Sequence, residues 1–398
     1  MKLLNQFFLI SLLSLLLTSC GNNKNVSPSP LFKQTSSSSP SYINSQYRAV
    51  YIMGDSLSDT GASVGSLNSV LNSMKQEFPG LKWTEKVYFS PPFYKERSFS
   101  NGPLIVEYAI ASLGLQITPG WSFSITPELK HWILKEKSKE LTIALADILR
   151  KEHLKSVSYV SHDQIGTNYA VSSARASVGD DLPYTLWFNQ FQLKNQLNAI
   201  IKHHPDIGAN DLFIIIIGGN DVKAALFDKN PIGIINESVT EIFNVLNILA
   251  KRNVKHIVVS NVPDIGSIPA VINTKGQAFA TKLTQEFNKQ LNDQIENLRK
   301  IYPTIDIRLF DINNALQTVI ANYKKKGQNT SKACVLDMPI NQGAMTLLEL
   351  VLTGGLKVSY IPPCNDCKIS DYVFFDDVHT TTLADQTAGN ILYNLIVK

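Results

Sequence analysis

Short segments rich in apolar, often β-branched residues recur along the chain and end in small or polar residues. They lie at 49–53, 212–217, 257–259 and 305–309. A strand buried on both faces of a parallel sheet typically has such a sequence. Between the last two segments, apolar residues recur at the spacing of one helix face: Phe279, Leu283, Phe287, Leu291, Ile295 and Leu298. This alternation predicts an α/β fold, a three-layer α/β/α sandwich around a mainly parallel sheet.

Polar residues at two of the strand ends are candidates for chemistry. The first apolar segment runs into 54–57 (GDSL), which places Ser56 between a strand and a helix, where ligands of open α/β sheets gather. Near the C-terminus, Asp376 and His379 follow the apolar segment 372–375. A serine hydroxyl needs a base to take its proton and a carboxylate to orient that base. The three side chains are therefore candidate catalytic residues of a serine hydrolase, although each segment alone also fits a turn that caps a helix.

A third polar segment follows the central strand 212–217. It contains Gly218, Gly219, Asn220 and Asp221. An asparagine side chain in this position can donate a hydrogen bond to an oxyanion, and loss of one such donor costs about 3 kcal/mol in other hydrolases. Asn220 is therefore a candidate oxyanion-hole residue, with Gly219 in support. The alternative is a turn that caps the next helix.

In this order, the three segments resemble the GDSL or SGNH esterases and lipases. The matching blocks are 54–61, 218–221 and 376–379, while 99–103 and 261–266 also resemble family segments. The resemblance spans nearly all of the chain after residue 49 and implies the SGNH-hydrolase, flavodoxin-like form of the sandwich. No zinc-ligand spacing, phosphate-binding loop or nucleic-acid-binding stretch accompanies it, so we expect no cofactor, no metal and no nucleic-acid partner.

One block departs from the family pattern. The segment 166–174 resembles the block in which relatives carry a glycine pair, one of whose amides contributes to the oxyanion hole. Here the pair is Ser172 and Ser173. Because a backbone N–H does not depend on the side chain, the resemblance implies the Ser172 amide as a donor, together with the Ser56 amide and the Asn220 side chain.

The mechanism implied by these residues is acyl transfer through Ser56, with His379 as the base and Asp376 as its orienting carboxylate. Because His379 must be neutral to accept a proton, we expect activity to rise with pH near 6.5. Asp55 and Asp377 are rival carboxylates, and we expect both to be structural.

The N-terminus resembles that of a bacterial lipoprotein. Lys2 precedes an apolar stretch at 7–17 that is too short to span a bilayer, and Cys20 follows directly. We expect a signal peptide at 1–19 and a lipidated Cys20 that anchors an exported protein. With Gly21 next, the lipoprotein rule points to the outer membrane. An uncleaved anchor or an ordinary secreted protein is the alternative.

Composition separates a tether from a single folded domain. Residues 20–45 are rich in Ser, Asn and Pro and predict a flexible tether. We expect one hydrolase domain at 46–398, with insertions at about 81–160 and 334–370, because nucleophile and base lie at its two ends. A hydrophobic content of 44% and a net charge of +4 fit a globular protein.

The first insertion carries aromatic residues that either pack into the core, which we favour, or contact lipid. They are Trp83, Tyr88, Phe89, Phe93, Tyr94, Trp121, Phe123 and Trp132.

Three cysteines remain after Cys20. Cys334, Cys364 and Cys367 are an odd number for an oxidising compartment, so we expect one disulfide and one free thiol. Either Cys334 pairs with one of the other two, which closes a loop of about thirty residues and stabilises the fold by ~3 kcal/mol, or Cys364 pairs with Cys367. We favour the longer loop.

The substrate is the least determined feature. Bacterial family members with similar blocks are often lysophospholipases, phospholipases A or acyltransferases, and a membrane anchor would place the site beside lipid. We therefore favour a lipid acyl hydrolase. A short-chain or carbohydrate O-acetyl esterase, a thioesterase and a catalytically silent lipid- or glycan-binding lipoprotein are the alternatives.

Overall fold

The computed structural model describes residues 46–137, 159–180, 185–335 and 354–398. All of them belong to one compact unit, residues 42–398. The expected signal peptide, Cys20 and the tether lie outside the described residues, as do parts of both expected insertions, and those expectations stay predictions.

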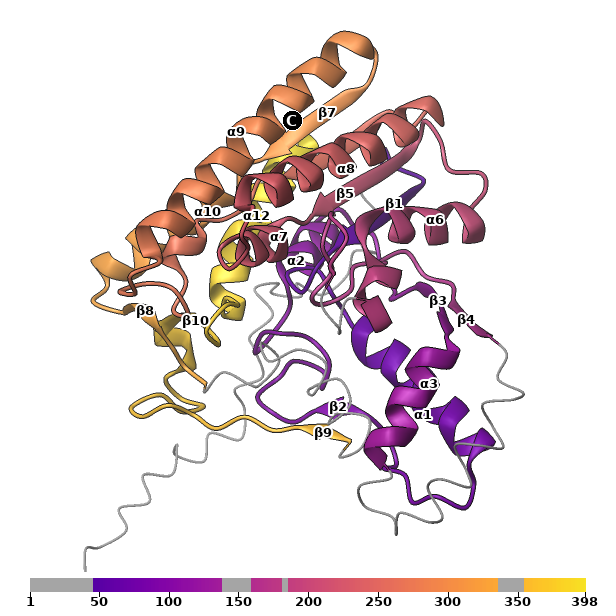
Figure 1. Cartoon of the computed structure of the whole chain (residues 1–398). Helices are drawn as coiled ribbons and strands as arrows, with labels where there is room; N and C mark the ends of the chain where they lie inside the picture. The colour runs from indigo at the N-terminus through magenta and orange to yellow at the C-terminus, as the bar shows by residue number, and fades with distance from the viewer. Residues whose placement is uncertain (1–45, 138–158, 181–184, 336–353) are drawn as a thin grey trace, which may run out of the picture. The chain divides into compact units, whose positions relative to one another are not determined.

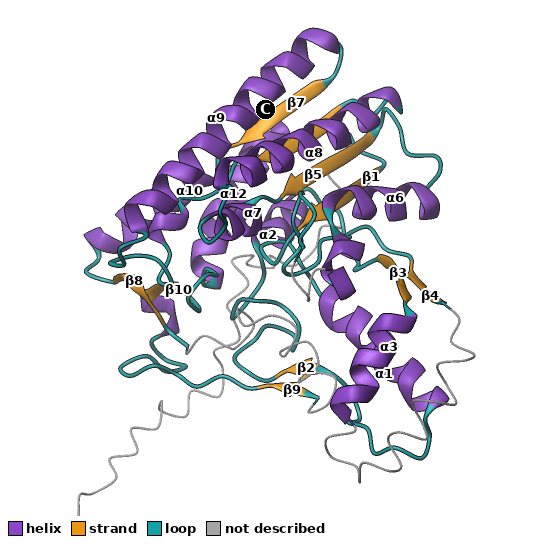
Figure 2. Ribbon diagram, in the orientation of Figure 1, coloured by secondary structure: helices purple, strands orange, loops and turns teal. Residues whose placement is uncertain are grey.

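A four-stranded parallel sheet forms the centre of this unit (Figures 1 and 2). Its strand order is β1-β5-β6-β7, with β1 at Ala49–Gly54, β5 at Asp211–Ile216, β6 at His256–Ser260 and β7 at Asp306–Phe310. The strands are parallel and in register, so that Gly54 pairs with Ile216 and their carboxyl ends meet at one edge. The apolar segments of the sequence predicted these strands correctly.

Alternate side chains of the strands supply two apolar layers. Tyr51, Met53 and Phe213 face one layer of helices, whereas Ile52 and Leu212 face the other. Both sets are buried, which explains the continuous apolar sequences. The first layer contains α6 (Leu193–His203), α8 (Pro231–Lys251) and α9 (Gln277–Ile301), and the second contains α2 (Ile105–Ser112) and α12 (Thr382–Val397). The predicted α/β/α sandwich is confirmed.

Two further helices follow the carboxyl ends of strands. α7 (Gly219–Ala225) follows β5, and α10 (Ile312–Lys325) follows β7. The 3-10 turn η2 (Ile265–Ser267) lies after β6. Among the described helices, α8 is long and apolar enough to cross a membrane by length and composition. Its buried face packs against the sheet and α9 in the first apolar layer.

A second hydrophobic core lies beside the sandwich. The aromatic residues of the first insertion are buried or half-buried in the described structure, so the packing interpretation is confirmed. Among these aromatic residues, Phe89, Phe93 and Phe123 are the buried ones. The elements of this core are α1 (Ala62–Glu77), α3 (Pro127–Lys137), η1 (Phe188–Phe191) and the strand pairs β2 (Tyr88–Phe89) with β9 (Gly355–Leu356) and β3 (Trp121–Ile125) with β4 (Val160–Gln164).

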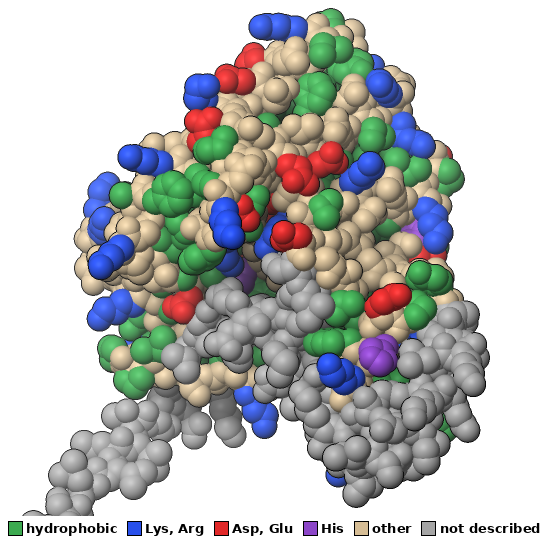
Figure 3. Space-filling view, in the orientation of Figure 1, with side chains coloured by type: hydrophobic (Ala, Val, Ile, Leu, Met, Phe, Trp, Pro, Cys, Tyr) green, Lys and Arg blue, Asp and Glu red, His purple; other side chains and the backbone are tan. Residues whose placement is uncertain are grey.

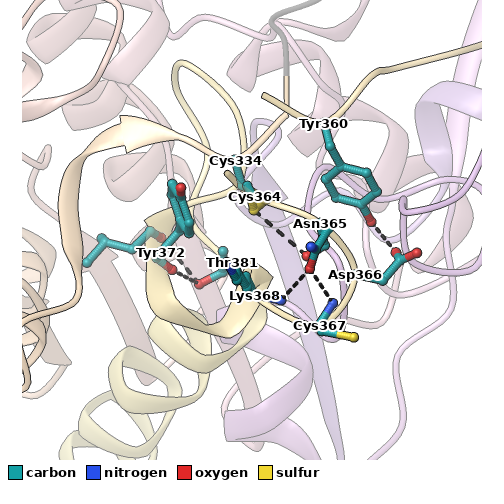
Figure 4. The surroundings of a disulfide bond; sticks show 10 residues. Cys334, Tyr360, Cys364, Asn365, Asp366, Cys367, Lys368, Tyr372 and Thr381 are labelled. Atoms are coloured by element: carbon teal, nitrogen blue, oxygen red, sulfur yellow. Dashed lines mark hydrogen bonds between the residues drawn. A yellow bond between two sulfur atoms is a disulfide. The ribbon is translucent and has the colours of Figure 1, made fainter. Parts of the chain in front are cut away.

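A disulfide closes the longer of the predicted loops. Cys334 is bonded to Cys364 across 30 residues (Figure 4). The Cys334 amide donates to the carbonyl of Phe374, which ties the bridge to the strand that precedes Asp376. Cys367 is disulfide-bonded as well, so the expected free thiol is wrong for the described residues. The neighbouring elements are β8 (Asn329–Ala333), η4 (Ile369–Asp371) and β10 (Tyr372–Phe374).

Candidate active site

Ser56 lies at the carboxyl edge of the central sheet. It follows β1 directly, and the Asp55 amide donates to the Ile216 carbonyl of the neighbouring strand. Only 8% of Ser56 is exposed. The sheet thus fixes the backbone that leads into this hydroxyl, as expected for a side chain that must keep one orientation.

His379 and Asp376 lie beside this serine, although they are more than three hundred residues away in sequence. His379 Nε2 is 2.7 Å from Ser56 Oγ. On the other side of the ring, Nδ1 is 2.7 Å from Asp376 Oδ2. The three sequence-predicted side chains therefore form one hydrogen-bonded chain in the order hydroxyl, imidazole, carboxylate.

Asp376 is held as an ionised acceptor. Its Oδ1 accepts the backbone N–H groups of Val378 at 2.8 Å and of His379 at 2.7 Å. Burial acts to raise the pKa of Asp376, but interaction with His379 and these backbone donors outweighs burial and leaves the pKa below its usual value. The rival carboxylates Asp55 and Asp377 do not occupy this position.

Phe99 contacts the His379 ring, a role that the sequence did not indicate. The ring centroids are 4.9 Å apart, at an interplanar angle of 30°. Ser100 then donates to the Thr380 carbonyl, and the Phe375 amide donates to the His379 carbonyl. The segment that resembles a family block at 99–103 therefore holds the histidine loop in place.

Asn220 lies at the start of α7 and lines the same cavity as Ser56. One N–H of its Nδ2 donates to the Ala174 carbonyl at 3.0 Å, and a carboxamide carries a second N–H. The preceding Gly218 has a φ of 114°, and a Cβ there would come within 2.4 Å of the Phe287 ring. A glycine is thus required for the turn that places Gly219 and Asn220.

The Ser172 amide is engaged elsewhere. It donates to Asp59 Oδ2 and to Ser63 Oγ, both at 2.9 Å. The Asp59 carboxylate is fully buried and depends on such donors. We therefore correct the expectation that Ser172 contributes to the oxyanion hole. Of the two serines, Ser173 has a left-handed backbone conformation, with a φ of 65°.

An open cavity lies beside Ser56; the space between its lining atoms is about 700 Å³ with the solvent at its mouth included, and about 60 Å³ of it is open to the centre of a water molecule. Its polar lining comes from Ser56, Asn220, Lys223, His379 and Thr380, together with two buried carboxyl groups. The rest of the lining is apolar and comes mainly from α10, α12 and the segment around η2: Ile105, Ile265, Ile268, Ile312, Leu316, Val319, Ala384 and Ala388. Such a cavity suits a long apolar group attached to a polar reacting centre.

Two buried carboxyl groups in the lining take no part in the hydrogen-bonded chain. Burial raises the pKa of Asp55 to about 6 and that of Asp385 to about 7. Asp385 accepts a hydrogen bond from the Thr380 hydroxyl at the start of α12, which fixes the loop next to His379. Among the described residues, no group of three His, Cys, Asp or Glu side chains is placed to hold a metal ion.

Asp385 should make the protein less stable as pH rises. Its folded pKa lies above the unfolded value of about 3.9, so the folded state binds the extra proton, and stability is lost between pH 4 and pH 7. Between pH 5 and pH 8, we expect the free energy of unfolding to fall by about 2 kcal/mol more in the native protein than in Asp385→Asn. Urea unfolding at both pH values measures this difference, and parallel behaviour of the two proteins would refute it.

The chain is similar to several known proteins. A model of the GDSL-like lipase/acylhydrolase family matches residues 50–392. A GDSL esterase/lipase of Arabidopsis thaliana is 24% identical over 371 residues, which cover 86% of this chain and 82% of the relative. Phosphatidylcholine-sterol acyltransferase of Aeromonas hydrophila is 24% identical over 289 residues, which cover 72% of this chain and 65% of that relative. The crystal structure of phospholipase A1 from Streptomyces albidoflavus NA297 aligns with 88% of this chain and 99% of the phospholipase chain. The sequence identity is 11% and the TM-score is 0.32.

Proposed function

The chain belongs to the GDSL-like lipase/acylhydrolase family of ester hydrolases, and from that premise we propose that it removes long acyl chains from lipids, as a lysophospholipase or phospholipase A. The observation that carries this proposal is the apolar cavity that opens directly beside Ser56. A short-chain esterase would leave most of that apolar surface without a partner. The Aeromonas relative acts as a sterol acyltransferase by name, so transfer of the acyl chain to another alcohol is included in the proposal.

Hydrolysis would proceed through an acyl-enzyme. His379 Nε2 takes the proton of Ser56 as Oγ bonds to the ester carbonyl carbon, and Asp376 stabilises the resulting imidazolium. The second N–H of Asn220 and the Ser56 amide stabilise the oxyanion. The alcohol then leaves with the proton from His379. A water molecule, deprotonated by the same histidine, releases the fatty acid and restores Ser56.

The apolar part of the cavity would hold the acyl chain. Each methylene transferred from water to this lining contributes about 0.8 kcal/mol of binding. A long-chain ester should therefore be bound far better than an acetyl ester. The proposal includes the predicted lipid anchor at Cys20, which would keep the active site beside lipid at the outer membrane. Incorporation of labelled palmitate into the native protein, and its loss when Cys20 is replaced, tests the anchor.

Filling the cavity should shorten the preferred acyl chain. Ala388 lines the cavity on α12, and Ala388→Leu adds bulk where the chain would lie. We expect kcat/KM for lysophosphatidylcholine to fall about tenfold or more, while kcat/KM for p-nitrophenyl acetate changes less than about threefold. Fatty-acid release from both substrates measures the change.

Asn390→Leu is the matched control, because it adds the same side chain to the exposed side of α12. It should leave both rates near their native values. A native protein that cleaves only the acetyl ester would favour the short-chain esterase, and one that cleaves neither would refute the proposal.

A further inference from the structure

Lys223 brings a cationic side chain to the cavity beside Ser56. It stands on α7, three residues after Asn220, and both side chains line the cavity beside Ser56. Residues three apart on a helix lie on the same face, about 5–6 Å apart. The Lys223 side chain therefore starts within one helical turn of the side chain that would contact the ester oxygen.

Besides Lys223, the charged or titratable groups of the lining among the described residues are the carboxyl groups of Asp55 and Asp385 and the His379 imidazole. Lys223 lowers the pKa of Asp55 and so opposes the effect of burial, which places its charge within electrostatic range of the residue before the nucleophile. Lys223 itself is half-exposed, so the field of its charge extends into the mouth of the cavity.

The apolar lining is distributed differently. α10, α12 and the segment around η2 supply most of the apolar residues, whereas α7 supplies Gly219, Asn220 and Lys223. An ester that reacts at Ser56 has an acyl chain on one side of its carbonyl and an alcohol on the other. If the chain occupies the apolar part, the alcohol is left near α7.

We propose that Lys223 binds the phosphate of a glycerophospholipid and so selects phospholipids over neutral glycerides. In a glycerophospholipid, only the carbons of glycerol and its oxygens separate the acyl ester from the phosphate, which matches one helical turn between Asn220 and Lys223. An ammonium group binds a phosphate as a point charge, and hydrogen bonds to an ionised acceptor are stronger than neutral ones. This inference rests on the proposed lipid hydrolysis and adds the headgroup.

Charged and apolar side chains lie close together on one face of the molecule (Figure 3). Figure 3 shows basic, acidic and histidine side chains close together in the recessed middle of one face, with apolar side chains beside them.

Two substrates with the same acyl chain test the proposal: 1-palmitoyl lysophosphatidylglycerol and 1-palmitoylglycerol, each in Triton X-100 mixed micelles. For Lys223→Met we expect kcat/KM on the phospholipid to fall about tenfold, mainly through KM, and kcat/KM on the glyceride to stay within about twofold. Lys223→Arg should recover most of the loss. Added salt should weaken the native preference for the phospholipid.

Lys229→Met is the matched control, because it removes the same charge from an exposed position outside the cavity lining. An equal loss in this variant would mean general attraction to an anionic surface and would overturn the inference. Equal losses on both substrates in Lys223→Met would assign the lysine to the oxyanion or to Asp55 instead. Inorganic phosphate can also be added during glyceride cleavage. If it inhibits the native protein but not Lys223→Met, Lys223 belongs to a site for free phosphate rather than for the lipid. If the native protein cleaves neither substrate, the proposed function itself fails.

Discussion

Alanine in place of Ser56 should lower kcat for fatty-acid release by roughly 10⁵-fold or more. The hydroxyl lies 2.7 Å from His379 Nε2, and no other described group takes this position against the imidazole. Without it, only direct attack by water remains, assisted by the oxyanion donors and by substrate binding. Release of palmitate from lysophosphatidylcholine, followed at saturating substrate, measures the loss.

Ser58→Ala is a suitable control for this variant. Ser58 is two residues away and fully buried, and its Oγ has no hydrogen-bond partner among the described residues. Removal of that hydroxyl should change kcat by less than about fivefold. A Ser56→Ala protein that folds normally and retains a tenth of native activity would show that the nucleophile lies elsewhere.

The central fold could be predicted because the sequence records it locally. A strand in a parallel sheet is buried on both faces, so 212–217 is continuously apolar, and α9 repeats its apolar residues at helical spacing. Ser56, Asp376 and His379 could be found for a related reason. Ser56 follows β1 of the central sheet, and Asp376 and His379 follow the apolar strand β10, which pairs with β8 outside that sheet. The position after an apolar strand marked each of them as a candidate, but their meeting in space does not follow from one sheet edge.

The wrong assignment of Ser172 shows where local reasoning ends. The segment looks like an oxyanion-hole block, but nothing near it in sequence indicates that Asp59, 113 residues earlier, reaches its amide. A buried carboxylate must find donors, and this requirement appears only once the chain is folded. The free thiol was misjudged in the same way, since the bonding of Cys367 depends on which cysteines meet in space.

The cavity was not predicted at all. Its lining residues, such as Ile268, Leu316 and Ala388, have the composition of an ordinary core and come from elements far apart in the chain. Whether such residues close on one another or leave a space depends on how helices pack, which binary patterning does not encode. The size of substrate that fits is therefore determined by how the helices pack, whereas the reacting groups can be recognised in short sequence segments.

Asparagine in place of Asp376 should lower kcat by roughly 10⁴-fold while leaving the fold intact. Asp376 Oδ1 is held by the backbone N–H groups of Val378 and His379, so the oxygen of the introduced amide should stay there. Its NH₂ group would then face His379 Nδ1, to which it can only donate. The imidazole proton would move to Nε2, and that nitrogen could no longer accept the proton of Ser56.

Asp377→Asn removes the same charge one residue later and separates this tautomer effect from a change in electrostatics. Because Asp377 is not hydrogen-bonded to the His379 ring in the described structure, its replacement should change kcat by less than about fivefold. Steady-state rates of the two variants and the native protein, measured at the same pH, provide the comparison. Equal losses in the two variants would mean that negative charge near the loop, and not the orientation of the ring, is what Asp376 contributes.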